Sequence, residues 1–185
     1  MQIRDAVQSD FEQITAIYNE VLANSTAIYN DRPATVEERI SWWRSRVTQG
    51  YPVLVAASDS QAVSGPQIAG FATFGDFRSW PGYRFTVEGT VHIRAGERGH
   101  GVGTALLNAI VARARTQGKH IMIAGVDSEN AASLRFLERF GFARAGCLRE
   151  VGYKFNRYLD LVFMQYWIAP PRETQSGECR SGERQ

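Results

Sequence analysis

The stretch Arg98-Gly-His-Gly-Val-Gly-Thr104 places three glycines at alternate positions between a strand pattern and a helix pattern. Before it, residues 86–93 are rich in β-branched side chains, and after it apolar residues repeat at helical spacing from Leu106 to Ala114. Glycine lets a backbone approach a ligand closely and turn its N–H groups outward. The start of a helix adds unpaired N–H donors and a partial positive charge. The stretch therefore predicts an anion-binding turn suited to a diphosphate, with Arg98 as an additional cation.

This turn has three alternative interpretations. A P-loop requires Lys and then Ser or Thr after its last glycine, but Gly103 is followed by Thr104 and Ala105. A dinucleotide site requires the first strand of a parallel set and an acidic residue about 20 positions later, where this chain has Ile123. Both nucleotide motifs are therefore excluded. A glycine-rich turn without a ligand stays open from these residues alone.

The remaining elements follow from apolar spacing and from the residues that cap or break them. Two capping boxes, Ser9-x-x-Glu12 and Thr35-x-x-Glu38, predict the starts of the first two helices. Strands are predicted at 2–6, 53–57, 68–74, 86–93, 120–126, 143–150 and 159–168, with further helices between Gly103 and Gly118 and over 130–140. The order β-α-α-β-β-β-α-β-α-β-β predicts an α+β domain with a mixed sheet. Its middle strands should be antiparallel, and the units 86–126 and 120–150 should be βαβ-like.

Composition excludes several classes of protein. The chain has 185 residues, 44% of them hydrophobic and 22% charged, which is typical of one folded domain. Its net charge is +2 and its basic residues are scattered, so charge indicates neither nucleic-acid nor membrane binding. There is no apolar run of about 18 residues and no signal-peptide pattern at residues 1–12. We therefore expect no membrane span and a cytoplasmic protein.

Metal binding and disulfide bonding are not expected. Cys147 and Cys179 form no CxxC motif, and the three histidines show no metal-ligand spacing. Residues 170–185 contain no apolar residue larger than proline apart from Cys179. We expect a domain over residues 1–169 and a disordered tail over 170–185.

Two motifs together carry a family resemblance. Arg98-x-x-Gly101-x-Gly103 resembles the Q/R-x-x-G-x-G/A signature of the GNAT N-acetyltransferases, whose loop backbone binds the pyrophosphate of acetyl-CoA. Asn130-x-x-Ser133 with Gly141-Phe142 resembles a second segment of that superfamily, which lies beside the pantetheine arm. The resemblance covers residues 2–168 and implies a GNAT-like sheet, mixed and mostly antiparallel, with helices on both faces. It also implies acetyl-CoA as co-substrate.

A narrower resemblance concerns the substrate. Residues 83–91 and 152–160 are similar to the phosphinothricin and methionine sulfone/sulfoximine acetyltransferases. Those enzymes acetylate the α-amino group of small amino-acid analogues and are typically homodimers. The resemblance implies the same function here, with a small-molecule amine as partner and a second copy of the chain, but no nucleic acid and no membrane. Two alternatives were weighed: a protein or peptide N-acetyltransferase, and a non-catalytic acyl-CoA-binding module.

Glu88 is the candidate general base, because acetyl transfer needs a deprotonated amine and a substrate amine is mostly ammonium at neutral pH. Its context Phe85-Thr-Val87 is apolar, and burial would raise the pKa of the carboxylate toward a useful range. From the residues alone, a strand glutamate facing solvent is the alternative. The resemblance assigns the matching glutamate of the subgroup as the base.

The resemblance also names binding residues. The expected substrate-binding residues are Gly75, Asp76, Phe77, Arg78, Phe85, Thr86 and Val87. Arg78 is included because arginine binds a carboxylate through a bidentate pair; an exposed loop or a dimer contact is the alternative for this segment. The expected cofactor-binding residues are Val91, His92, Ile93, Arg98, Gly99, His100, Gly101, Val102, Gly103, Thr104, Asn130 and Ser133.

The general acid that protonates the leaving thiolate is left open. Many members of the superfamily place Tyr four residues before the Gly-Phe pair, and the phosphinothricin enzymes have His there, whereas this chain has Leu137. Tyr153, Tyr158 or solvent could protonate the thiolate, and the sequence does not choose among them.

Overall fold

The computed structural model of the chain describes residues 1–58 and 66–170. Most of the predicted tail, with Cys179, and most of the predicted turn after Ser58 lie outside the described residues. The strands are β1 (Gln2–Asp5), β2 (Val53–Ala57), β3 (Ile68–Asp76), β4 (Thr86–Ile93), β5 (Ile121–Asp127), β6 (Ala143–Lys154) and β7 (Arg157–Trp167). The helices are α1 (Phe11–Asn24), α2 (Val36–Thr48), α3 (Val102–Thr116) and α4 (Ala131–Phe140), with short 3-10 turns at Gln8–Asp10, Pro81–Tyr83 and Ala95–Glu97. The predicted order of strands and helices is confirmed.

The described strands form one seven-stranded sheet in the order β1-β2-β3-β4-β5-β7-β6. Every neighbouring pair is antiparallel except β4 and β5, which are parallel. The mixed, mostly antiparallel sheet is therefore confirmed. The unit β4-α3-β5 joins neighbouring strands, whereas β7 is inserted between β5 and β6.

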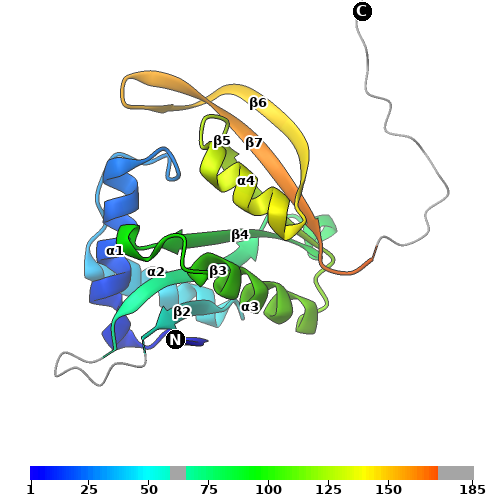
Figure 1. The fold of residues 1–185 in the computed structure, drawn as a ribbon. Helices are drawn as coiled ribbons and strands as arrows, with labels where there is room; N and C mark the ends of the chain where they lie inside the picture. The colour runs from blue at the N-terminus through cyan, green and yellow to red at the C-terminus, as the bar shows by residue number, and fades with distance from the viewer. Residues whose placement is uncertain (59–65, 171–185) are drawn as a thin grey trace, which may run out of the picture.

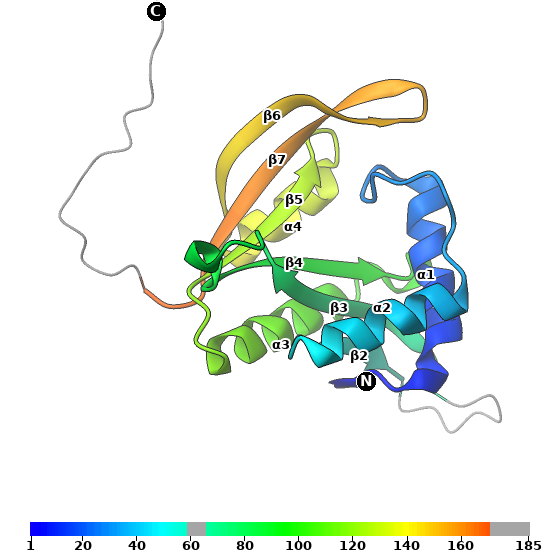
Figure 2. The same cartoon turned by 180° about the vertical axis from the view of Figure 1, so that it is seen from behind.

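Helices cover both faces of the sheet, as expected (Figure 1). Alternation along β2 explains the two cores: Val53 and Val55 face α1, and Leu54 faces α3. The α3 and α4 face is the larger core, centred on residues such as Leu106 and Ile110, while α1 packs its buried stripe on the opposite face. Figure 2 shows α1 and α2 together on that second face.

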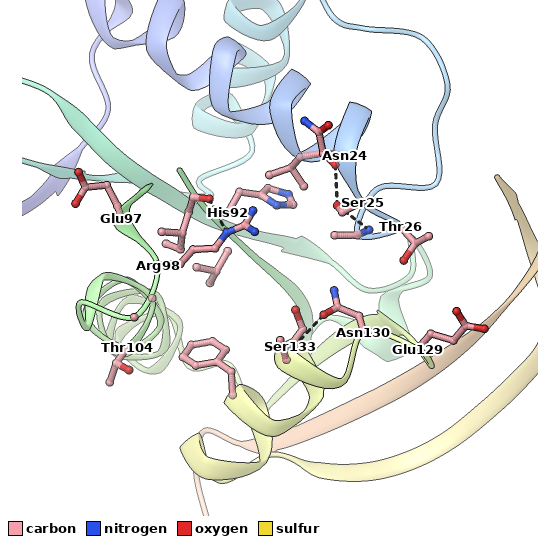
Figure 3. Close-up of a pocket in the computed structure, with 18 of the residues that line it drawn as sticks. Asn24, Ser25, Thr26, His92, Glu97, Arg98, Thr104, Glu129, Asn130 and Ser133 are labelled. Atoms are coloured by element: carbon pink, nitrogen blue, oxygen red, sulfur yellow. Dashed lines mark hydrogen bonds between the residues drawn. The ribbon is translucent and has the colours of Figure 1, made fainter. Parts of the chain in front are cut away.

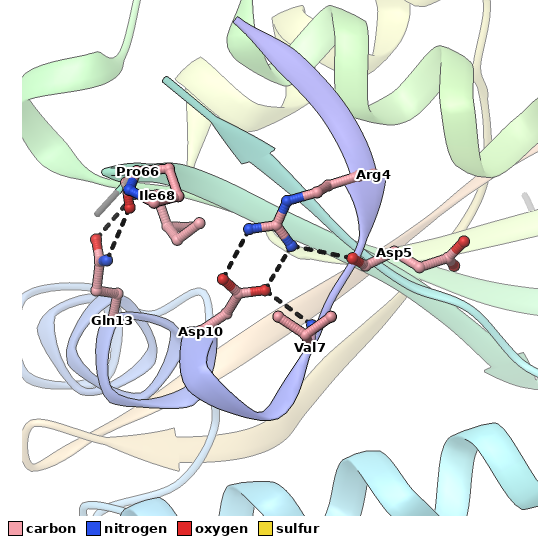
Figure 4. Close-up of polar contacts among 7 residues, drawn as sticks. All are labelled: Arg4, Asp5, Val7, Asp10, Gln13, Pro66 and Ile68. Carbon is pink, nitrogen blue, oxygen red and sulfur yellow. Dashed lines mark hydrogen bonds and ion pairs between the residues drawn. The ribbon is translucent and has the colours of Figure 1, made fainter. Parts of the chain in front are cut away.

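The start of α1 differs from the prediction. Ser9 and Glu12 are exposed and form no capping box. Instead the Asp10 carboxylate accepts a hydrogen bond from the Val7 N–H at 2.8 Å and two from the Arg4 guanidinium at 2.7 and 2.8 Å (Figure 4). The prediction of a capping box at Ser9 is wrong because Asp10, one residue later, is placed to accept from both the Val7 N–H and the Arg4 guanidinium. The second capping box, between Thr35 and Glu38, is confirmed.

The last two strands are longer than predicted. β6 continues to Lys154 through a register irregularity between Leu148 and Gly152, and β7 begins at Arg157. The irregularity includes Glu150, which has a positive φ of 55°. Sequence periodicity failed here because an irregular strand interrupts the alternation of side chains. Among the described helices, none is both long and apolar enough to cross a membrane.

Candidate active site

The site is built where β4 and β5 separate. Their parallel pairing joins Thr86 to Ile121 and ends with Glu88 opposite Ile123. Beyond that point, β4 continues to pair with β3, while β5 pairs only with β7. The edge of β4 from Gly89 to Ile93 therefore offers backbone groups that no strand satisfies.

The glycine-rich turn follows this open edge. Gly99 and Gly101 have φ values of +83° and +81°, in the left-handed region that favours glycine. Gly103 is small for a different reason: an added Cβ would lie 3.3 Å from the ring of Phe136 on α4. Two glycines thus shape the turn, and the third lets α4 approach α3.

Gly101 is the N-cap of α3 and has no side chain to occupy the first N–H groups of the helix. The first intrahelical bond joins the Ala105 N–H to the Gly101 carbonyl at 3.0 Å. The preceding N–H groups of the first turn are therefore free to bind an anion. Arg98 stands exposed beside them, its Nε donating to the Ile93 carbonyl at 3.4 Å.

A pocket of about 930 Å³ lies between these elements. Figure 3 shows Arg98 and Thr104 on one side of it, Asn130 and Ser133 on another, and His92 between them. The predicted cofactor residues that line it are Val91, His92, Ile93, Arg98, Gly99, Gly101, Gly103, Thr104, Asn130 and Ser133. His100 is exposed outside the lining, and the Val102 side chain is buried in the core. Val102 can therefore contribute only its backbone.

Asn130 has a structural task as well as a place in the pocket. Its side-chain oxygen accepts the Ser133 N–H at 3.1 Å and so caps α4. Its amide nitrogen and the Ser133 hydroxyl form no hydrogen bond within the described ranges. Both groups are therefore available to a ligand.

His92 presents a neutral ring to the pocket. Burial, together with the positive charges of Arg39 and Arg98, lowers the pKa of His92 to about 4. Its ring centroid lies 5.3 Å from that of Phe71 and 6.5 Å from that of Tyr18. His92 therefore packs as an uncharged wall residue near neutral pH.

One wall of the pocket was not expected from the sequence: the segment Asn24–Ala27, which begins at the last residue of α1. Lys154, at the end of β6, holds this segment in place through hydrogen bonds. Its Nζ donates to the carbonyls of Leu22, Ser25 and Ile28, at 2.5, 2.9 and 2.8 Å. A buried ammonium thus replaces the missing helical donors at the end of α1.

Other lining residues were also missed. They come from α4 and from the end of the β6–β7 hairpin: Phe136, Arg139, Phe140, Phe155 and Arg157. Helical spacing could have shown that Phe136 and Arg139 share a face with Ser133, because they follow it at three-residue steps. The hairpin residues required knowledge of the fold.

Glu88 lies at the point where β4 and β5 separate, which we call the fork. Its carboxylate reaches solvent, yet desolvation by surrounding atoms raises the pKa of Glu88, while the charges of Arg78 and Arg46 oppose that rise. A Cβ added at Gly125 of β5 would lie 3.6 Å from Glu88 Oε1, so no side chain covers the carboxylate at this position. The direction of the shift is the one expected, although Glu88 is less covered than expected.

The side chains of the residues expected to bind substrate point in different directions in the structure. Gly75 is opposite Glu88 in the register, but Asp76 points to the other face, where its carboxylate accepts a short hydrogen bond from the Tyr51 hydroxyl. Phe77 packs edge-on against Phe163, with ring centroids 6.2 Å apart. Arg78 is exposed and stacks over Phe77 at 5.2 Å.

The second expected segment is also split between faces. Thr86 lies on the same face as Glu88, because side chains alternate along β4. Val87 is fully buried against the α3 core, so only its backbone can meet a substrate. Phe85 is exposed beneath the guanidinium of Arg84.

The candidates for general acid lie apart from the pocket lining. Leu137 is buried in the core, so its position contributes no acid. Tyr153 and Tyr158 are exposed on the hairpin and pack against each other, with ring centroids 5.2 Å apart. Neither tyrosine lines the pocket.

Comparison with known proteins agrees with this geometry. The family model of the Acetyltransferase (GNAT) family matches residues 14–142. The chain is 45% identical over 170 residues to the L-methionine sulfoximine/L-methionine sulfone acetyltransferase of Pseudomonas paraeruginosa, covering 92% of this chain and 96% of that protein. It is 33% identical over 165 residues to the phosphinothricin N-acetyltransferase of Streptomyces coelicolor, covering 89% and 95%.

Among solved structures, the chain is similar to a GNAT superfamily phosphinothricin acetyltransferase from Sinorhizobium meliloti in complex with acetyl-CoA. The TM-score is 0.86 and the sequence identity 31%, covering 96% of this chain and 94% of that one. The expected family and enzyme class are confirmed: the chain belongs to the GNAT family of acetyltransferases.

Proposed function

We propose that this protein transfers the acetyl group of acetyl-CoA to the α-amino group of a small amino-acid analogue of the methionine sulfone, methionine sulfoximine or phosphinothricin type. The observation that carries the proposal is the position of Glu88, the last residue of β4 paired to β5 before the fork opens. A base at that point stands at the start of the open edge along which the acetyl donor would lie. The names of the relatives support this class of substrate.

Acetyl-CoA would be held mainly by backbone groups. The free N–H groups at the start of α3 and the guanidinium of Arg98 would bind the diphosphate. The open edge Gly89–Ile93 would pair with the amides of the pantetheine arm, flanked by the Asn130 amide and the Ser133 hydroxyl. Acetyl-CoA bound in this way would bring its thioester toward Glu88.

The transfer is direct and sequential. Glu88, directly or through a water molecule, removes a proton from the substrate ammonium. The amine nitrogen then attacks the thioester carbon, and a backbone N–H of β4 stabilises the negative charge on the carbonyl oxygen. The carbon–sulfur bond then breaks, and the nitrogen of the new amide loses its second proton to solvent. The leaving thiolate takes a proton from solvent, since Tyr153 and Tyr158 do not line the pocket. Glu88 passes the proton that it removed to solvent before the next turnover. The products are the N-acetylated amino acid and free CoA.

We propose further that the protein is a cytoplasmic homodimer. β6 is an edge strand of the sheet, and the exposed apolar residues Leu148, Val151 and Tyr158 lie on its hairpin. A long exposed apolar edge strand favours pairing with a second chain. Sedimentation should give twice the chain mass, and a Val151→Asp variant should shift toward the monomer. The cytoplasm is proposed because acetyl-CoA is an intracellular metabolite.

A substrate panel tests the proposed function. CoA release should be followed with L-methionine sulfone, L-methionine sulfoximine, phosphinothricin, a basic peptide with a free N-terminus and a polyamine. The three amino-acid analogues should be turned over well above the peptide and the polyamine. Preference for the peptide would establish the alternative of a protein acetyltransferase. Acetyl-CoA binding without turnover of any amine would establish the non-catalytic binding module.

A further inference from the structure

One arginine beside Glu88 reaches the sheet through a gap left by a glycine. Arg46, on α2, is half-buried, and a Cβ added at Gly75 of β3 would lie only 1.4 Å from Arg46 Nη1 and 2.6 Å from its Cζ. Any side chain at position 75 would displace the guanidinium. The pair Arg46 and Gly75 therefore puts a fixed positive charge directly on the face of the sheet.

That charge lies one strand away from the proposed base. Gly75 is the register partner of Glu88, and neighbouring strands lie about 4.8 Å apart. Within residues 1–58 and 66–170, the side chain of Arg46 forms no hydrogen bond and no ion pair, not even with Glu88. Its aromatic contact is with Trp42, whose ring centroid lies 5.7 Å from the guanidinium carbon. A half-buried guanidinium thus stands with its donors unused.

A second guanidinium adds to the positive charge of this region. Arg39 lies on α2, one turn before Trp42 and two turns before Arg46. Its guanidinium carbon is 3.8 Å from the centroid of the Trp42 ring and 4.4 Å from that of the Tyr18 ring. Its Nε is buried without a hydrogen-bond partner in the described structure. Burial and, to a lesser extent, the charge of Arg46 lower the pKa of Arg39 to about 10, so the two guanidinium groups lie near each other. The charges of Arg78 and Arg46 both lower the pKa of Glu88. The positive charge around Glu88 therefore favours an additional anion.

The covalent structure of an α-amino acid fits this spacing. Its amino group and its carboxylate are bonded to the same carbon, so an amine held at Glu88 places the carboxylate over the neighbouring strand. At that place the sheet carries Gly75 and the Arg46 guanidinium. The planar fork of a guanidinium matches the two oxygens of a carboxylate.

We infer that Arg46 binds the α-carboxylate of the substrate and so selects α-amino acids over simple amines. This inference rests on the proposed function and deepens it. It differs from the expectation from sequence that Arg78 plays this part. The charge of Arg78 also acts on Glu88, but Arg78 is exposed and stacked on Phe77, whereas Arg46 is half-buried against Gly75.

The test compares two substrates that differ only in the carboxylate: L-methionine sulfone and its decarboxylated analogue, 3-(methylsulfonyl)propylamine. Arg46→Gln should lower kcat/KM for L-methionine sulfone about 100-fold. Arg46→Lys should lower it about 10-fold, because lysine keeps the positive charge but cannot donate two parallel hydrogen bonds to a carboxylate. At a pH well above the raised pKa of Glu88, where loss of the Arg46 charge leaves the base ionised, both variants should match the wild type on the decarboxylated amine and in acetyl-CoA affinity. Arg44→Gln is the matched control, since Arg44 is an exposed arginine of the same helix that contacts Gln8.

The outcomes separate this inference from the function on which it rests. An equal loss on both substrates would show that Arg46 is only structural and would overturn the inference, as would full activity of Arg46→Gln on L-methionine sulfone. If the wild type acetylates no amino acid, the proposed function fails. The role of Arg46 in binding the carboxylate is then tested by calorimetric titration of L-methionine sulfone in the presence of CoA. Weaker binding by Arg46→Gln would then support the inference; equal binding, or none by the wild type, would overturn it.

Discussion

Glu88 and Ile123 form the last register pair between β4 and β5. The residue proposed as base therefore lies at the point where the sheet stops pairing and a ligand-binding edge begins. Substrate and acetyl donor can meet only near such a point, because the donor occupies the opened edge and the amine must come from the face above it. The predictions below test this arrangement and the elements that hold it.

Replacing Glu88 should change how stability depends on pH. The pKa of Glu88 is raised in the folded chain, so the folded chain holds this proton more tightly than the unfolded chain does. The ionised carboxylate thus costs stability above the raised pKa, and the cost disappears below the ordinary pKa of about 4.3. Glu88→Gln should therefore have a higher Tm than the wild type at about pH 7.5 and an equal Tm at about pH 3.5. Calorimetry at both pH values checks this, and a lower Tm at the higher pH would contradict it.

Gly101→Ala should weaken acetyl-CoA binding. A residue with a Cβ at a φ of +81° is strained by about 1–2 kcal/mol, and relief of the strain would turn the first N–H groups of α3 away from the ligand. We expect at least a 10-fold rise in the Kd for acetyl-CoA, measured by calorimetry. Gly96→Ala is the control, since Gly96 has no positive φ and a Cβ there would meet nothing within 4 Å. Equal effects of the two substitutions would argue against a role for the turn.

Asp10→Ala should destabilise the fold by about 2–4 kcal/mol without altering the active site. The side chain of Asp10 is only 6% exposed, and its loss would leave Arg4 and the Val7 N–H without their partner. Glu12→Ala, at the exposed position of the capping box expected from sequence, should change stability by less than about 0.5 kcal/mol. Urea unfolding of both variants measures the difference. If Glu12→Ala lowered the free energy of unfolding more than Asp10→Ala did, the capping box between Ser9 and Glu12 would be supported instead.

Lys154→Met should loosen the wall of the pocket that follows α1. Three carbonyls would lose a buried donor, which should cost about 2–4 kcal/mol. Because the segment Asn24–Ala27 lines the pocket, the KM for acetyl-CoA should rise several-fold while kcat changes little. Lys119→Met is the control, because the half-buried Lys119 donates to a single carbonyl and does not line the pocket. An unchanged KM in a destabilised Lys154→Met variant would limit Lys154 to a role in folding.

Much of the site could be predicted because its signals are local. A glycine turn between a strand and a helix, and a helix start at Asn130, can each be found within a few residues of sequence, whereas the proposed role of Glu88 depends on the family resemblance. The physical reason is that backbone conformation and helix ends depend on neighbouring residues. The mixed sheet followed from the same local periodicities.

The remaining features depend on contacts between distant segments. Arg46 meets Gly75 only because α2 packs across β3, and Lys154 meets Leu22 only because the hairpin folds back over the end of α1. Burial also determines which side chains can face the substrate. Asp76 and Val87 are adjacent in sequence to Gly75 and Glu88, but their side chains point to the opposite face of the sheet, toward α3. A strand sequence shows alternation, but not which face will hold the site.

The measurement that tests the central claim most directly is steady-state acetylation of L-methionine sulfone by the wild type and by Glu88→Gln, as a function of pH. We predict N-acetyl-L-methionine sulfone as the product. Glu88→Gln should lower kcat about 100- to 10,000-fold, with acetyl-CoA affinity retained. The wild-type rate should fall as the pH decreases through the raised pKa of Glu88. Glu37→Gln, at an exposed acid on α2, should leave kcat unchanged. A Glu88→Gln enzyme with wild-type kcat from about pH 6 to pH 9 would contradict the account.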